Sequence, residues 1–293
     1  MITTEEAFEK YRQRLELSNT ERKNTIKRHN EVRELIRADF VIDRDLLTGS
    51  YKRHTKTKPL KDVDIFFVLG EKERNKYRHK SPSDLIKAFV KTLRAEYGDD
   101  AVEPGRRCAT VEFEKNTTDE EGKVLSIDAV PAFDLGDCYE IPDRMRGDWI
   151  KTDPEIHMEQ ATAKNKELGG KWIPLVKMIK RWNRSAGKSI KPAFLIEVMM
   201  QDLVDAPFTT YPDEVRRFFA AALDGIERQW PDPAGYGPPV SEQMTPPLIA
   251  VAKEKLRQAE MKAALAVRLQ KQGKQTEAIA LWREIMGKYF PTS

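Results

Sequence analysis

The sequence contains few cysteines and histidines and no long apolar run. Only two cysteines, Cys108 and Cys138, and four histidines occur, none at the CxxC, HxxxH or HExxH spacing of zinc ligands, which argues against a structural zinc site. No apolar segment approaches the ~20 residues of a membrane-spanning helix. The N-terminal residues also lack the basic and apolar regions of a signal peptide. We therefore expect a soluble, cytoplasmic protein without a membrane partner.

The net charge is small for a chain of this length. Lys and Arg number 51 against 47 Asp and Glu, so the total charge alone does not indicate binding to nucleic acid. With 293 residues, of which 40% are hydrophobic, the chain is long enough for one large domain or two smaller ones. The position of the charges is therefore more informative than their sum.

The first half is expected to combine helices with a sheet. Thr3 and Ser18 each start a T/S-x-x-E capping box, which predicts two N-terminal helices, the second ending near Ala38. Pro82 stands where the first turn of a further helix is expected. Because strand-like runs cluster in this half, we expect an α+β domain. The predicted strands are 63–69, 109–113 and 124–133, the last two joined by a hairpin loop over 114–123.

The second half is predicted to be almost entirely helical. Its segments are bounded by proline and glycine, which favour the first turn and the C-terminal end of a helix respectively. We therefore divide the chain into a sheet lobe, 1–150, and a helical lobe, 151–293. The predicted helices are 153–169 and 171–186, then helices that open at Pro192, Pro212 and Pro246, and a last one between Gly273 and Tyr289.

Asp62 and Asp64 flank Val63 at the head of an apolar strand. Since side chains alternate along a strand, both carboxylates point to one face while Val63 points into the core. Neighbouring carboxylates repel each other and raise each other's pKa, and a bound divalent cation removes that conflict. An Asp-x-Asp at a strand start is also typical of a solvated edge or a turn, so this pair alone leaves both interpretations open.

Asp128 repeats this arrangement in the strand 124–133, where the apolar residues share the other face. If this strand pairs beside the first, the three acids converge. Mg²⁺ prefers carboxylates together with substrate phosphates, and two ions roughly 3.5–4 Å apart would activate a hydroxyl and stabilise a leaving pyrophosphate. The predicted cofactor is therefore Mg²⁺, with Mn²⁺ as an alternative.

Gly49 and Ser50 lie shortly before the acidic pair and are followed by a run of basic residues. Glycine lets the backbone approach a phosphate closely, and exposed N–H groups with the Ser50 hydroxyl bind phosphate oxygens. Positive charge beside a triphosphate site is expected as well. A simple turn at Gly49 and a solvated basic loop are the alternative interpretations. The basic residues are Lys52, Arg53, Lys56, Lys58 and Lys61.

The predicted helix 171–186 has one basic and one apolar side. Leu175, Val176, Ile179 and Trp182 form the apolar side, which we expect to be buried. A solvated helix face is the alternative interpretation for the last two basic residues. The basic residues, at i, i+3, i+4 and i+7, are Lys177, Lys180, Arg181 and Arg184.

Together these segments resemble the cGAS/DncV-like nucleotidyltransferases (CD-NTases), relatives of the oligoadenylate synthases. The family pattern GS-x-x-R-x-T…D-x-D…D is matched by 49–55 (GSYKRHT), 62–65 (DVDI) and 125–128 (LSID). In the second half, Lys180-Arg181-Trp182 and 191–197 are similar to two helices of the family. The C-terminal segments 280–283 and 289–291 are similar to the end of bacterial members. The resemblance thus covers nearly the whole chain.

The resemblance implies a bilobed, polymerase-beta-like nucleotidyltransferase fold with a mixed sheet lobe and a helical C-terminal lobe. Nucleotide would be held between the lobes. The implied residues are the catalytic metal ligands Asp62, Asp64 and Asp128 and the triphosphate-binding residues Gly49, Ser50, Arg53 and, from the helical lobe, Lys180.

The implied reaction is attack by a ribose hydroxyl of one nucleotide on the α-phosphate of another, with Asp128 as the proton acceptor. Repetition and ring closure would give a cyclic di- or trinucleotide; we expect a cyclic oligoadenylate made from ATP as a bacterial antiphage signal. A HORMA-domain regulator and a nucleic-acid activator are the partners considered, although the chain lacks the His-Cys cluster of the animal sensor branch. The alternatives are an enzyme that tails RNA or a small acceptor, and a noncatalytic regulator that binds nucleotide or nucleic acid.

Overall fold

The computed structural model describes residues 2–113 and 126–292, and the chain falls into two compact units. The sheet unit comprises Leu17–Met158 with Ala234–Gly237. The helical unit comprises the chain up to Glu16, Glu159–Pro233 and the chain from Pro238 on. This division differs from the expected lobes 1–150 and 151–293, because the N-terminal helix joins the helical unit and the central boundary follows residue 158.

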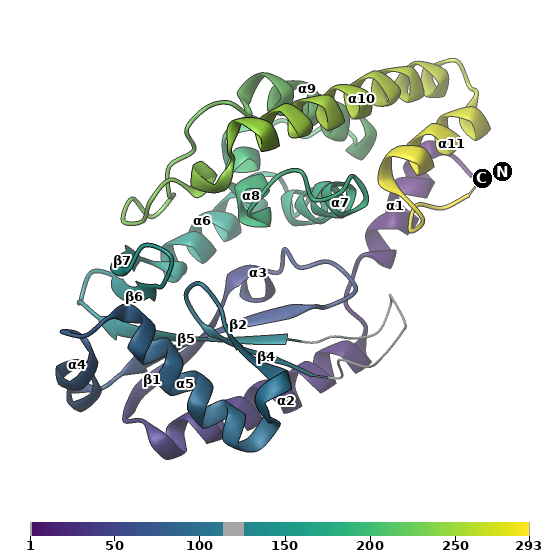
Figure 1. Cartoon of the computed structure of the whole chain (residues 1–293). Coiled ribbons are helices and arrows are strands. Elements are labelled where there is room, and N and C mark those ends of the chain that lie inside the picture. The colour runs from purple at the N-terminus through teal and green to yellow at the C-terminus, as the bar shows by residue number, and fades with distance from the viewer. Residues whose placement is uncertain (1, 114–125, 293) are drawn as a thin grey trace. The chain divides into compact units, whose positions relative to one another are not determined.

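Within the described residues, seven strands form the mixed sheet of the sheet unit. They are β1 (Ile42–Thr48), β2 (Asp62–Leu69), β3 (Val102–Pro104), β4 (Ala109–Glu112), β5 (Ser126–Asp134), β6 (Tyr139–Asp143) and β7 (Asp148–Thr152). The order is β1-β2-β5-β4-β3, and β6 pairs with both β5 and β7. β2 and β5 are parallel and adjacent, and the other pairs are antiparallel (Figure 1).

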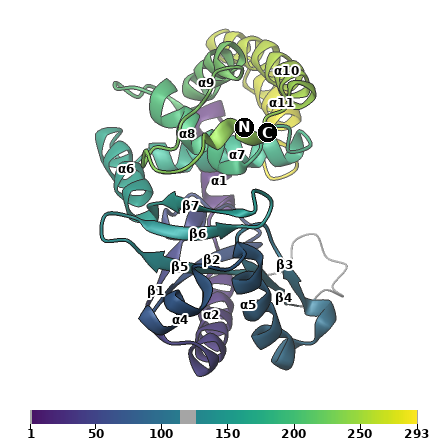
Figure 2. The ribbon, with the colours of Figure 1, turned by 60° about the vertical axis from the view of Figure 1, so that its left-hand side comes forward.

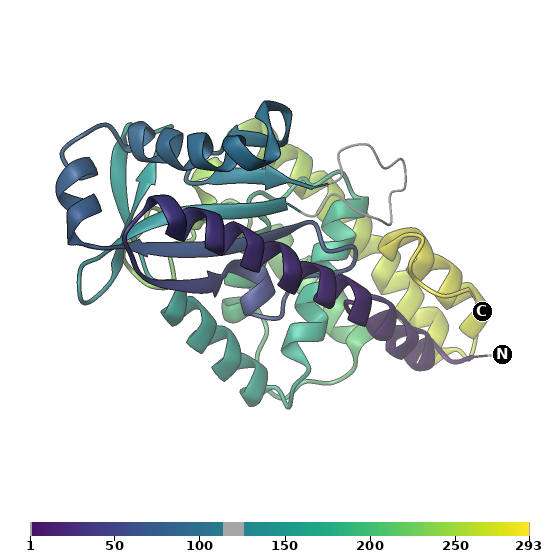
Figure 3. The same ribbon diagram turned by 90° about the horizontal axis from the view of Figure 1, so that it is seen from below.

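One face of the sheet packs against helices α2 (Asn19–Asp39) and α5 (Pro82–Tyr97), which lie side by side in Figure 3. Ile65 of β2 and Ile127 of β5 point into this core and are fully buried. The strand alternation therefore directs Asp62, Asp64 and Asp128 to the opposite face. That face is partly covered by β6 and β7, whose Ile141 and Ile150 pack against residues of β2 and β5.

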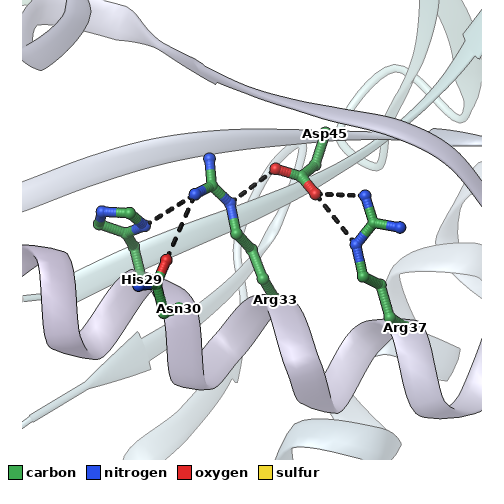
Figure 4. A network of polar contacts seen from close by, with 5 residues as sticks. All are labelled: His29, Asn30, Arg33, Arg37 and Asp45. Atoms are coloured by element: carbon green, nitrogen blue, oxygen red, sulfur yellow. Dashed lines mark hydrogen bonds and ion pairs between the residues drawn. The ribbon is translucent and has the colours of Figure 1, made fainter.

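A network of ion pairs and hydrogen bonds connects the strand β1 with α2 (Figure 4). Arg33 and Arg37 of α2 both pair with Asp45 of β1, at 2.6 and 2.5 Å. The Arg33 guanidinium also lies 3.1 Å from His29 Nδ1. Because a guanidinium only donates hydrogen bonds, Nδ1 accepts and the imidazole is neutral, with its proton on Nε2. Burial and the charge of Arg33 lower the pKa of His29, which agrees with a neutral imidazole.

The predicted strand 63–69 is confirmed as β2, and 109–113 as β4. The predicted strand 124–133 corresponds to β5, although residues 124 and 125 and the loop 114–123 lie outside the described residues. The antiparallel pairing of β4 with β5 is the pairing expected of a hairpin. The strands β1, β3, β6 and β7 and the helices α3 (Gly49–Lys52) and α4 (Glu71–Tyr77) were not predicted.

The helical unit contains α1 (Thr4–Arg14), most of α6 (Pro154–Glu167), α7 (Trp172–Ser185), α8 (Ala193–Leu203), α9 (Tyr211–Gly225), α10 (Pro246–Lys271) and α11 (Gln275–Met286) (Figure 2). The helices predicted to open at Pro192, Pro212 and Pro246 are thus present, and the last one ends at Met286 rather than near Tyr289.

α1 belongs to this unit because its apolar side packs on α11 and the C-terminal segment. Phe8 meets Trp282 and Phe290 edge-on, with ring centroids 4.9 and 5.0 Å apart. Thr4 also donates both its backbone N–H and its hydroxyl to the Gln275 side chain. In the part of the chain that the structure describes, no helix is long and apolar enough to cross a lipid bilayer.

Candidate active site

Asp64 and Asp128 lie directly opposite each other on the adjacent parallel strands β2 and β5. Side chains at paired positions of neighbouring strands point to the same face. Asp62, two residues before Asp64, shares that face. The structure therefore places the three predicted acids on one side of the sheet, at the end where both strands begin.

The pKa values of Asp64 and Asp128 are both raised, as expected of buried carboxyl groups that lie close together. Burial and the negative charges of Asp128 and Asp62 raise the pKa of Asp64 from 3.8 to about 7. Burial raises the pKa of Asp128 as well, and the charge of Asp62 adds to the rise. Such a cluster is stabilised by a cation, and its oxygen donors are those that Mg²⁺ prefers.

Gly49 lies against the Asp64 carboxylate at the turn that follows β1, where it is the first residue of the one-turn helix α3. Its φ of +63° belongs to the left-handed region. A Cβ built on Gly49 would lie 1.8 Å from Asp64 Oδ2 and 2.6 Å from its Cγ. Any other residue would therefore displace the carboxylate, which gives a physical reason for glycine here beyond a simple turn.

The segment after Gly49 folds back on the turn through the Ser50 carbonyl. That carbonyl accepts the backbone N–H groups of Thr55 and Lys56, at 3.0 and 3.1 Å. The Arg53 N–H donates to the Gly49 carbonyl at 3.2 Å, and the Arg53 side chain is buried. The charge of Arg53 opposes the rise in the pKa of Asp64, so this predicted nucleotide-binding residue acts on the acidic cluster.

Lys56 pairs with the outermost acid. Its Nζ lies 2.5 Å from Asp62 Oδ2, and only 6% of the lysine side chain is exposed. Within the described ranges, no three His, Cys, Asp or Glu side chains are already grouped to hold a metal ion. The structure thus pairs Asp64 with Asp128 on neighbouring strands, while Asp62 on the same face forms an ion pair with Lys56.

A hydroxyl on β4 and the thiol of Cys108, just before β4, lie beside Asp128, and neither was predicted. Thr110 is the β4 partner of Asp128, and its hydroxyl donates to Asp128 Oδ1 at 2.6 Å. Cys108 Sγ lies 3.5 Å from the same hydroxyl oxygen. The thiol also hydrogen-bonds to Asp128, which opposes the rise in the pKa of that carboxyl group. Burial raises the pKa of Cys108, so the thiol keeps its proton.

Lys180 of α7 belongs to the helical unit, and its predicted contact with phosphates stays a prediction. Its Nζ lies 2.5 Å from Glu197 Oε1 of α8, and both side chains are buried. Lys177 on the same helix pairs with Glu16 at 2.8 Å and is likewise buried. Both of these lysines of the predicted basic stripe are therefore buried and ion-paired. The apolar side is buried as predicted: Leu175, Val176, Ile179 and Trp182.

Comparison with known proteins assigns the family. The family described as "Second Messenger Oligonucleotide or Dinucleotide Synthetase domain" matches residues 1–165, more than half of the 293 residues. This chain belongs to that family. A cyclic AMP-AMP-AMP synthase of Acinetobacter sp. (strain ATCC 27244 / 9458) is 26% identical to it, over 100% of this chain and 87% of that protein.

Two solved structures of E. coli MS115-1 CdnC have the same fold. CdnC with ATP has a TM-score of 0.75 at 17% identity, covering 99% of both chains. The CdnC:HORMA-deltaN complex has a TM-score of 0.72 at 17% identity, covering 98% of both chains. The α+β, polymerase-beta-like fold and the cGAS/DncV-like (CD-NTase) family predicted from the sequence are thereby confirmed. The synthetase is a nucleotidyltransferase of the cyclic oligonucleotide synthase class.

Proposed function

We propose that this synthetase joins ribonucleoside triphosphates, ATP first among them, into a cyclic oligonucleotide at the cluster of Asp62, Asp64 and Asp128. A ribose hydroxyl of one nucleotide attacks the α-phosphorus of another, and the bond to the leaving pyrophosphate breaks. The observation that carries this proposal is the register of Asp64 with Asp128 beside the Gly49 turn. Crowded carboxylates beside a close backbone approach suit a nucleotide bound through its triphosphate.

Mg²⁺ or Mn²⁺ is the cofactor that fits this donor set. Asp64 and Asp128 would hold it from the start, and Asp62 would join them on leaving Lys56. The bound cation supplies a lower pKa for the attacking hydroxyl and compensates the charge of the leaving group. Burial and the negative charges of Asp128 and Asp62 raise the pKa of Asp64, and this supports the assignment because a bound cation favours the ionised carboxylate.

Asp128 is the proposed acceptor of the proton that leaves the attacking hydroxyl. The hydrogen bonds from Thr110 and Cys108 favour its ionised form, and the one from Thr110 orients the carboxylate. The Cys108 thiol lies 3.5 Å from the Thr110 hydroxyl, beside the same carboxylate. The proton thus moves from the ribose oxygen to a carboxylate whose orientation is set by β4.

The triphosphate is proposed to lie at the turn of Gly49 and Ser50, where the missing side chain lets the backbone approach its oxygens. Arg53 adds positive charge on the same segment. Lys180 is proposed to bind the same phosphates on the resemblance to the family. Release from Glu197, or a shared contact with it, would be required for that role.

Product analysis tests the proposal. The protein is incubated with Mg²⁺ and ATP, then with all four ribonucleotides, and the products are identified by mass spectrometry after phosphatase treatment. A phosphatase-resistant cyclic species is expected, with adenine as its base. Label that ends on added RNA would instead identify a tailing enzyme. The absence of any transfer, also with the HORMA-domain regulator and nucleic acid added, would identify a noncatalytic binding protein.

A cyclic oligoadenylate is the proposed product because the Acinetobacter relative is named a cyclic AMP-AMP-AMP synthase, and an antiphage signal is its proposed role.

A HORMA-domain regulator is proposed because CdnC was solved in complex with one. Co-purification of this chain with a HORMA protein of its own host tests the second point. A nucleic-acid activator and a cytoplasmic location stay predictions.

A further inference from the structure

Lys56 is a buried lysine inside the acidic site, and its backbone is fixed there. Only 6% of its side chain is exposed, which is unusual for lysine unless its charge is compensated. Its N–H donates to the Ser50 carbonyl at 3.1 Å, and so does the N–H of the preceding Thr55 at 3.0 Å. These hydrogen bonds fix the backbone from which the Lys56 side chain extends, next to the Gly49 turn.

The charge of Lys56 acts on all three acids. Its Nζ lies 2.5 Å from Asp62 Oδ2. The same charge opposes the rise in the pKa of Asp64 and of Asp128. One buried ammonium thus offsets part of the repulsion among three carboxylates that share a face of the sheet.

We propose that Lys56 is an internal counter-cation of this site, which a divalent metal must displace from Asp62 before the third carboxylate becomes available. This inference rests on the proposed function, because it assumes that the cluster binds metal. Lys56 then has two effects of opposite sign: it stabilises the metal-free protein, and it weakens metal binding by competing for Asp62. After the exchange, the ammonium stays tethered beside the turn proposed to hold the triphosphate.

The test compares Lys56→Gln with Lys52→Gln, which removes the same charge from an exposed lysine four residues earlier. Binding of Mn²⁺ alone is followed through the electron paramagnetic resonance signal of the free ion. Thermal unfolding is followed in EDTA. Lys56→Gln is expected to bind Mn²⁺ about tenfold more tightly than the wild type and to unfold at a lower temperature without metal. Lys52→Gln is expected to change neither.

The outcomes separate this inference from the proposed function. Wild-type protein that binds no Mn²⁺ overturns the proposed metal site and this inference with it. If the wild type binds Mn²⁺ and Lys56→Gln binds it equally or more weakly, the role of Lys56 is overturned and the metal site stands.

A stability measurement gives a second test if Lys56→Gln alone folds poorly. In EDTA, Lys56→Gln combined with Asp62→Asn should lose less thermal stability than the sum of the two single variants, because neither charge is then left alone. Purely additive losses would contradict the pairing.

Discussion

Gly49 and Asp64 lie so close together that a Cβ on Gly49 would come within 1.8 Å of Asp64 Oδ2. Two elements that are separate in the sequence, the turn after β1 and the first residues of β2, are therefore parts of one site. The backbone at Gly49 limits where the Asp64 carboxylate points, and the carboxylate leaves no room for a side chain at position 49. The proposed phosphate site and the proposed metal site thus depend on a single contact.

The first prediction concerns this contact. Gly49→Ala is expected to reduce cyclic oligonucleotide synthesis by about a hundredfold, because the methyl group displaces Asp64. It is also expected to lose about 1 kcal/mol of stability or more, since alanine is strained at positive φ. Initial rates and urea unfolding give the two quantities.

Gly136→Ala is the matched control. Gly136 also has a positive φ, +89°, but a Cβ there meets nothing within 4 Å. The control should share the strain and lose comparable stability while keeping full synthesis. Equal losses of activity in both variants would show that the contact with Asp64 is unimportant.

The second prediction concerns Thr110. Thr110→Val keeps the shape of the side chain but removes the hydrogen bond to Asp128, and kcat should fall by about tenfold, as expected for a hydrogen bond to a charged group. The KM for ATP should change little, because Thr110 is not proposed to touch the triphosphate. Thr110→Ser retains the hydroxyl and should restore kcat to within about twofold. A serine variant as slow as the valine variant would contradict the positioning role.

The third prediction concerns Lys180. Lys180→Ala should raise the KM for ATP by about tenfold with a smaller effect on kcat, as expected when a phosphate contact is lost. Lys177→Ala is the control, because Lys177 is a buried, ion-paired lysine on the same helix. Both variants should lose stability, since each leaves a glutamate without its lysine. Unchanged KM in Lys180→Ala would restrict this lysine to a structural role.

The elements nearest the chemistry were the most predictable part of the fold. Asp62 and Asp64 alternate with the apolar residues Val63 and Ile65, so the sequence itself shows that the two acids share one face of the strand. Ile127 and Ala129 did the same for Asp128. The parallel pairing that brings the two strands together was not readable from either segment, because it depends on contacts distant in the chain.

The missed parts have physical reasons as well. β1 carries Asp43, Arg44 and Asp45, and its charges are satisfied by partners on α2 and elsewhere rather than by solvent alone. Thr110 and Lys56 acquire their roles only through the sheet pairing and the folded-back segment after Ser50. A threonine in a short strand and a lysine in a basic run carry no distinctive local signal.

The fourth prediction is a pH dependence of stability at the junction of α2 with β1. The pKa of His29 is lowered from its usual 6.5 by burial and by Arg33. A depressed pKa in the folded state means that the contribution of His29 to stability is present above pH 6.5 and is lost as the pH falls through the folded pKa.

The wild type should therefore lose more stability between pH 7 and pH 5 than His29→Gln, which keeps an acceptor for Arg33 but does not titrate. Urea midpoints at several pH values measure the difference. Parallel profiles for the two proteins would contradict the neutral, accepting imidazole.

The proposed chemistry depends on the carboxylate cluster of Asp62, Asp64 and Asp128. A comparison of the wild type with two variants tests this dependence. Labelled ATP and Mg²⁺ are supplied to the wild type, to the double variant Asp62→Ala with Asp64→Ala, and to Asp134→Ala, which removes an exposed carboxylate from the far end of β5. Circular dichroism confirms that all three are folded. Phosphatase-resistant product is expected from the wild type and from Asp134→Ala, and none is expected from the double variant. Product from the double variant at a rate near that of the wild type would contradict the role of the carboxylate cluster.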